Sequence, residues 1–137
     1  MFKRLFIFST LAVAVWPASG DAQAIKNDIV VFAALDKVTA QISPLEVPLN
    51  KSTTFGALTI TARACNTRPP TEQPLTSAFV EVDETQLDDT RKRIFTGWMF
   101  AESPGLHGVE HPIFDVWLTR CKTSAPPASA GNAWKPE

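Results

Sequence analysis

His107 and His111 lie near the end of the chain with a carboxylate, Glu110, between them. Two histidines four residues apart on one helix are a common zinc-binding arrangement. Glu110, however, does not occupy the second position of an H-E-x-x-H motif, and Gly108 and Pro112 both disfavour a helix here. The stretch also offers no third ligand. We therefore expect two loop histidines and no bound metal.

His111 also lies four residues before Asp115, and a carboxylate can orient an imidazole as it does in hydrolase triads. The nucleophile would have to be Ser103, Thr96 or an unpaired Cys121. Nothing in the neighbouring sequence activates any of these groups, and the chain has no G-x-S-x-G stretch. We assign no catalytic residue, and an envelope hydrolase that uses His111 and Asp115 remains an alternative hypothesis.

Cys65 and Cys121 are the only cysteines of the chain. An even number of cysteines in an exported protein is usually paired, and only one pairing exists here. The bond would close a loop worth about 3–4 kcal/mol in the chain-entropy model. A redox-active pair is the other interpretation. Neither C-x-x-C spacing nor an adjacent basic helix start makes a thiol reactive here, so a structural disulfide is favoured.

Large aromatic side chains and an arginine are candidates for a contact surface. Trp, Met and Arg are enriched where proteins contact one another, although large aromatics also dominate the cores of small domains. Trp117 shares its strand face with Asp115 and Thr119, so we expect it to be partly exposed. The candidate partner-binding residues are Arg68, Trp98, Met99, His111, Asp115 and Trp117.

The amino-terminal segment has the parts of a secretory signal peptide. Lys3 and Arg4 precede an apolar run over residues 5–16, and residues 22–24 form an A-x-A cleavage triplet. The run is too short for a membrane span, which needs about 20 residues. We expect cleavage after Ala24 and a periplasmic mature chain without a membrane span. Removing the first 24 of the 137 residues leaves 113, which is enough for one domain.

The mature chain is almost neutral. The removed segment holds Lys3, Arg4 and Asp21, which leaves 11 basic against 13 acidic side chains and a net charge of −2. This balance gives no electrostatic footprint for nucleic acid, and the chain has no basic stretch for anionic lipid. We therefore expect neither of these partners, and we expect no cofactor because no nucleotide or metal motif is present.

The segments that must position these residues are mostly strands. Apolar and polar residues alternate with a period of two in residues 37–42, 45–49, 58–64, 78–83 and 114–121, which predicts half-buried strands. Residues 94–101 are apolar at both odd and even positions, which predicts a strand covered on both faces. Together these segments predict an all-β fold, a small antiparallel β-sandwich or barrel of about six to eight short strands.

Turn-rich stretches separate the predicted strands. Residues 66–76 are proline-rich and predict a rigid loop, and residues 87–93 are charged and predict a solvated turn. Ser103 and Pro104 predict a short helical turn within residues 103–110, because Pro suits the first helical position. We expect a single domain over residues 25–121 and a disordered tail over residues 122–137, which are rich in Pro, Ala, Ser and Gly.

The two cysteines restrict how the strands are arranged. Each lies at the C-terminal end of its strand, and the alternation places Cys121 on the face that carries Trp117. Neighbouring antiparallel strands place their C-termini at opposite ends of the ladder, too far apart for a disulfide. If the bond forms, the two strands run parallel, lie on facing sheets, or one of them bends at its end.

Several stretches of the chain resemble a known family. They are residues 35–40, 55–60, 63–70, 78–82, 97–101 and 111–117, together with Cys121. The G-W-M-F-A stretch at 97–101 and the H-P-x-F/Y-D-V-W stretch at 111–117 are the specific ones. On these residues the chain is identified as a member of the domain of unknown function 2155 family, small exported proteins typical of alphaproteobacteria. The resemblance implies a Gram-negative envelope location and the same two cysteines, and it implies no activity.

These observations favour a non-enzymatic periplasmic module that binds a protein or cell-envelope partner. The motivation is an exported domain with aromatic and Arg-bearing segments and no assembled catalytic group. Besides the envelope hydrolase, the alternative is a small barrel that binds glycan or peptidoglycan with Trp117 as a stacking platform.

Overall fold

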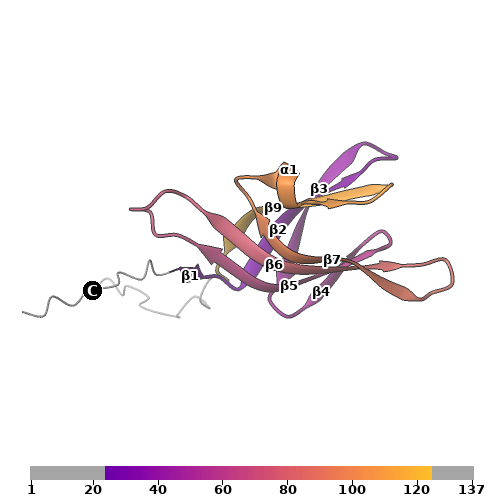
Figure 1. Ribbon diagram of the computed structural model, residues 1–137, viewed down its shortest axis with the longest axis horizontal. Helices are drawn as coiled ribbons and strands as arrows, with labels where there is room; N and C mark the ends of the chain where they lie inside the picture. The colour runs from indigo at the N-terminus through magenta and orange to yellow at the C-terminus, as the bar shows by residue number, and fades with distance from the viewer. Residues whose placement is uncertain (1–23, 125–137) are drawn as a thin grey trace, which may run out of the picture.

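The computed structural model describes residues 24–124, which form nine β-strands and one short helix (Figure 1). The elements are β1 (Ile25–Lys26), β2 (Ile29–Asp36), β3 (Gln41–Pro48), β4 (Ser52–Phe55), β5 (Leu58–Thr67), β6 (Thr76–Thr85), β7 (Arg91–Phe100), α1 (Pro104–His107), β8 (Val109–Glu110) and β9 (Phe114–Lys122). Residues 1–23 of the expected signal peptide and residues 125–137 of the expected tail lie outside the described residues. No helix within residues 24–124 is long and apolar enough to cross a membrane.

The strands form two antiparallel sheets that pack face to face. Sheet A has the order β1-β5-β6-β7, with β4 also paired to β5, and sheet B has the order β3-β2-β9-β8. In Figure 1 the strands of sheet A cross the lower part of the view and those of sheet B lie above them. Buried apolar side chains from both sheets form one core. This arrangement confirms the predicted all-β sandwich, and α1 is the predicted helical turn, packed against β7 and β9.

β2 is an inner strand of sheet B that the alternation of residue types did not reveal. Its Val30, Phe32 and Ala34 side chains are fully buried between the sheets, and Val31 on the opposite face is buried as well. A strand with apolar residues on both faces reads as a continuous apolar run and has no period of two. Residues 29–36 therefore carry the apolar run of a buried strand, which a search for a period of two does not detect.

The strand predicted at residues 37–42 is wrong over its first four residues. Residues 37–40 form the turn between β2 and β3. In this turn Ala40 has a positive φ of 57°, and Val38 is 78% exposed. The Asp36 carboxylate accepts hydrogen bonds from the backbone N–H groups of Val38 and Thr39. An aspartate at this position stabilises a turn, which outweighs the weak alternation that follows it.

The prediction that residues 94–101 are covered on both faces is also wrong. β7 is an edge strand of sheet A, with Met99 facing the core and Trp98 on the outer face, where it is 43% exposed. Trp98 packs edge-to-face on Phe79 of the neighbouring β6, with the ring centroids 5.4 Å apart. This aromatic pair across the two strands thus explains why an apolar residue, Trp98, lies on the outer face of β7.

A β-bulge in β5 turns Cys65 toward the core. The pairing of β5 with β6 leaves Arg63 without a partner, because Ala62 and Ala64 pair with successive residues of β6. A bulge adds one unpaired residue and reverses the face of every residue that follows it. Ala62 and Cys65 are therefore both buried although they differ in parity.

A second bulge in β9 turns Cys121 toward the core. Thr119 has no partner in the pairing of β9 with β2, and Cys121 pairs with the fully buried Val30. The Thr119 hydroxyl donates to the carbonyl of Val31 at 2.8 Å, which holds the bulge in place. The predicted position of Cys121 on the face that carries Trp117 is therefore wrong, because the bulge reverses the face.

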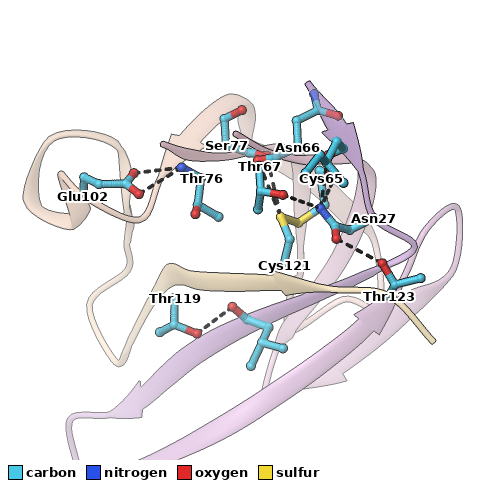
Figure 2. The surroundings of a disulfide bond; sticks show 12 residues. Asn27, Cys65, Asn66, Thr67, Thr76, Ser77, Glu102, Thr119, Cys121 and Thr123 are labelled. Atoms are coloured by element: carbon cyan, nitrogen blue, oxygen red, sulfur yellow. Dashed lines mark hydrogen bonds between the residues drawn. A yellow bond between two sulfur atoms is a disulfide. The ribbon is translucent and has the colours of Figure 1, made fainter. Parts of the chain in front are cut away.

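Cys65 and Cys121 form a disulfide that joins sheet A to sheet B (Figure 2). Their Cα atoms are 5.8 Å apart, within the range that a disulfide spans. Of the three arrangements predicted from the cysteine positions, the protein has the one in which the two strands lie on facing sheets. Cys65 is 1% exposed, which shields its sulfur from solvent thiols and favours the structural interpretation over a redox-active pair.

Asn27 connects the first strand, the disulfide and the end of β9 (Figure 2). Its backbone N–H donates to the carbonyl of Cys65 at 2.8 Å, and its side-chain amide donates to the Thr67 hydroxyl at 3.1 Å. Its side-chain oxygen accepts from the Thr123 hydroxyl, also at 3.1 Å. Asn27 is buried, so these bonds satisfy polar atoms that would otherwise be costly in the interior.

The domain extends beyond its predicted end at residue 121. β9 continues through Lys122, and Thr123 is bound by Asn27. The hydroxyl of Ser124, and then its backbone N–H, donate to the Asp28 carboxylate, and these hydrogen bonds lower the pKa of that carboxyl. The first three residues of the predicted tail therefore belong to the domain.

Candidate functional site

A groove lies beside α1, over the outer face of β8 and β9. It has a volume of about 400 Å³ and is lined by Pro104, Gly105, Gly108, Val109, Glu110, Asp115, Val116 and Trp117. Val116 and Leu118 of β9 face the core, so the alternating residues Asp115 and Trp117 face outward into the groove. Trp117 is half-buried there, as its strand face predicted. We call this site the Trp117 groove.

Two glycines determine the shape of the Trp117 groove. A Cβ placed on Gly108 would lie 3.0 Å from the carbonyl oxygen of Pro104 and 3.7 Å from the Cβ of Trp117, so α1 approaches β9 closely at this point. A Cβ placed on Gly105 would meet no atom within 4 Å. A larger side chain at Gly105 therefore has room at the edge of the groove without displacing the backbone.

Two carboxylates face each other at one end of the groove. Glu110 of β8 pairs with Asp115 of β9 in the strand register. Lys37 places its Nζ 2.7 Å from Asp115 Oδ1 and donates to the carbonyl of His111 at 2.9 Å. Like charges on directly opposed residues destabilise a sheet, and Lys37 relieves that repulsion by offsetting Asp115. Within residues 24–124, Glu110 forms no ion pair.

The ring of His111 points away from Asp115 and into the protein. It is 8% exposed, its Nε2 lies 3.0 Å from Glu84 Oε1, and its Nδ1 accepts from the backbone N–H of Ile113 at 3.1 Å. Phe114 stacks on the ring with the centroids 5.5 Å apart. Since both nitrogens are engaged, the ring has no free position to accept a proton from a nucleophile. This geometry counts against the hydrolase alternative.

Replacing His111 by alanine is expected to lower the free energy of unfolding by about 1–3 kcal/mol. The substitution removes the hydrogen-bond donor of the partly buried Glu84 and the stacking partner of Phe114. Urea unfolding followed by fluorescence measures the change. His107→Ala is the matched control, because His107 is exposed and loses only an edge-to-face contact with Phe100, which is expected to cost about 0.5–1 kcal/mol. Equal losses in the two variants would contradict a structural role for His111.

The two histidines do not share a helix. α1 ends at His107, whose ring packs edge-to-face against Phe100 with the centroids 5.5 Å apart. His111 follows β8 and faces Glu84 instead. Among the described residues, no three His, Cys, Asp or Glu side chains gather closely enough to hold a metal ion. The spacing of four residues therefore does not bring the two rings to one helix face.

The other candidate residues lie elsewhere. Arg68 lines a separate hollow of about 310 Å³ with Gln73, Pro74, Leu75 and Glu102. Trp98 lies on the outer face of sheet A, and Met99 is 1% exposed in the core. Asp115 and Trp117 are the two candidates that share the Trp117 groove. The side chains of Met99 and His111 belong to the interior and do not form a contact surface.

Lys37 and Glu84 are the partners of Asp115 and His111, and the sequence patterns did not identify them. Lys37 precedes His111 by 74 residues and Glu84 precedes it by 27, and strand pairing alone brings them together. Contacts of this kind leave no pattern along a single sequence. Gly108 is also a residue that the sequence patterns did not identify, because its close approach to the carbonyl oxygen of Val116 in β9 depends on how α1 packs against that strand.

Comparisons with known proteins agree with the family resemblance. The model of the family described as "Uncharacterized protein conserved in bacteria (DUF2155)" matches residues 30–121. An uncharacterized protein of Rickettsia prowazekii (strain Madrid E) is 25% identical over 88 residues, which make up 64% of this chain and 57% of that relative. This chain therefore matches little more than half the length of the relative. No solved structure matches the chain with significance.

Proposed function

The chain belongs to the DUF2155 family of bacterial proteins, and from this premise we propose that it is a non-enzymatic periplasmic module that binds a protein or cell-envelope partner through the Trp117 groove. The observation that carries the proposal is a half-buried tryptophan that lines an open groove of about 400 Å³ beside two carboxylates. Binding sites typically combine an aromatic anchor with a few placed polar groups.

Two features support export to the periplasm. β1 begins at Ile25, directly after the expected cleavage position, so the sandwich loses no described strand when the signal peptide is removed. The domain is also held by a disulfide between its sheets, and such bonds persist in oxidising compartments. Two features of the site support a binding role rather than catalysis. The Trp117 groove contains no imidazole, and both ring nitrogens of His111 are bound elsewhere.

Two substitutions in the groove are expected to reduce partner capture strongly. Gly105→Leu adds a bulky side chain to a residue that lines the groove, and Trp117→Ala removes its aromatic anchor, so each should reduce the captured partner about tenfold or more. The measurement is reversible crosslinking in living cells, affinity purification from the periplasmic fraction and quantification of the enriched component. Leu87→Ala is the matched control, because Leu87 is fully exposed in a distant turn.

Thermal unfolding of each variant separates a lost contact from a lost fold. Gly105→Leu should keep the melting temperature of the wild type, since a side chain there meets no atom within 4 Å at its Cβ. Wild-type capture by both groove variants, or no component enriched over an unrelated periplasmic protein, would contradict the proposed function. Amino-terminal sequencing of the purified protein should begin at Ile25, and a start elsewhere would contradict the proposed processing.

A further inference from the structure

We infer that the Trp117 groove receives a basic side chain, lysine or arginine, presented by a protein segment of the partner. The inference rests on the proposed function and names the chemistry that the groove recognises. Three properties of the groove lead to it: its uncompensated charge, its aromatic wall and the distance between the two.

The charge of the groove is negative at its Glu110 end. Lys37 is the one cation in contact with the pair of carboxylates among the described residues, and it is bound to Asp115 and to the carbonyl of His111. Glu110 is exposed and has no ion-pair partner within that part of the chain. A ligand that supplies a positive charge here therefore complements the site without displacing Lys37.

The wall of the groove suits the stem of such a side chain. Trp117 lines the groove together with Pro104 and Gly105 of α1, and Gly108 keeps α1 close to β9 beside the Cβ of Trp117. Lysine and arginine cover apolar surfaces with their alkyl stems and keep their charged ends in water.

The distance between the aromatic and acidic parts selects a long side chain. Trp117 and Asp115 are two residues apart on β9, which corresponds to about 6.8 Å along an antiparallel strand. A metal ion held by the carboxylates would not contact the indole. A short organic cation would reach either the indole or the carboxylates, but not both. A side chain that lies along the groove contacts Trp117 with its stem and Glu110 with its charged end.

The experiment is an NMR titration of the exported, oxidised protein with four probes. They are three blocked peptides, acetyl-Gly-Ser-X-Ser-Gly-amide with lysine, arginine or norleucine at X, and the glycan tri-N-acetylchitotriose. The readout is the shift of the Trp117 indole N–H and of the backbone N–H groups of Gly105 and Gly108. The lysine and arginine peptides should shift these signals with dissociation constants in the millimolar range, and norleucine should bind about three- to fivefold more weakly.

A pair of variants tests the role of the charge. Glu110→Gln should weaken the affinity for the lysine peptide about three- to fivefold. Added salt should weaken the affinity of the wild type for the same peptide. Glu72→Gln is the matched control, because Glu72 is paired with Arg68 outside the groove and its loss should leave the affinity unchanged.

The outcomes distinguish this inference from the proposed function. Equal affinity for the norleucine and lysine peptides, or no loss in Glu110→Gln, overturns the basic side chain while partner capture through the groove still stands. Shifts caused by the glycan alone overturn it in favour of a carbohydrate ligand. No shift with any probe also overturns it. The proposed function fails separately, when Gly105→Leu and Trp117→Ala capture a partner as well as the wild type does.

Discussion

The variant Cys65→Ala/Cys121→Ala is expected to unfold with a free energy about 3–4 kcal/mol lower than that of the oxidised wild type. The disulfide joins residues 56 positions apart, so its removal releases a long closed loop in the unfolded chain and raises the entropy of that state. A domain of this size is stable by only about 5–15 kcal/mol. The disulfide thus contributes a large share of the stability of the sandwich.

Urea unfolding without reductant, followed by tryptophan fluorescence, measures this loss. Reduction of the wild type supplies the internal control, because it should bring the wild-type transition to that of the double variant and leave the variant itself unchanged. A thiol assay on the denatured, unreduced wild type should find no reactive thiol. Coincident unfolding curves for the oxidised wild type and the variant would contradict the structural role of the bond.

The fold class could be predicted from the sequence because most of the strands have one buried face. Residues 78–82 and 114–118 alternate as a half-buried strand should, and each lies in a strand of the sandwich. Residues 58–62 also alternate in residue type, although Thr59 and Thr61 on their second face are buried as well. The alternation of residue types does not predict strands whose burial departs from this pattern. β2 has apolar residues on both faces and therefore lacks a period of two, and β7 carries Trp98 outward because Phe79 offers it a partner across the strands.

The candidate site was only partly predictable for a related reason. Trp117 and Asp115 were identified because strand alternation alone places them outward. The charge balance of the groove depends on Lys37, which reaches Asp115 from the turn after β2. The alternative hydrolase hypothesis paired His111 with Asp115 on sequence spacing, but the path of the chain between β8 and β9 directs its ring toward Glu84. Register and loop path are long-range properties that neighbouring residues do not encode.

The β-bulges in β5 and β9 are the clearest example of a long-range property that neighbouring residues do not encode. The bulge in β9 leads to a second prediction with a large expected effect on stability. The variant Arg120→Cys/Cys121→Ala moves the second cysteine back by one residue. It is expected to leave both cysteines as free thiols and to lose about 3–4 kcal/mol of stability, as the variant without cysteines does. Arg120 pairs with Val31 and is exposed on the outer face of sheet B, so a cysteine there points away from Cys65. The thiol assay on the denatured protein and the urea midpoint measure both consequences.

Arg120→Ala is the matched control, because it keeps Cys121 in place and should retain both the disulfide and the wild-type midpoint. The shifted variant decides between two structures of β9. In an unbroken strand, position 120 would share the inward face with Val116 and Leu118, and a cysteine there would face Cys65. With the bulge at Thr119, position 120 faces outward and position 121 faces inward. A shifted variant without reactive thiols would therefore show that the strand is unbroken, whereas free thiols would show that the bulge aims Cys121 at Cys65.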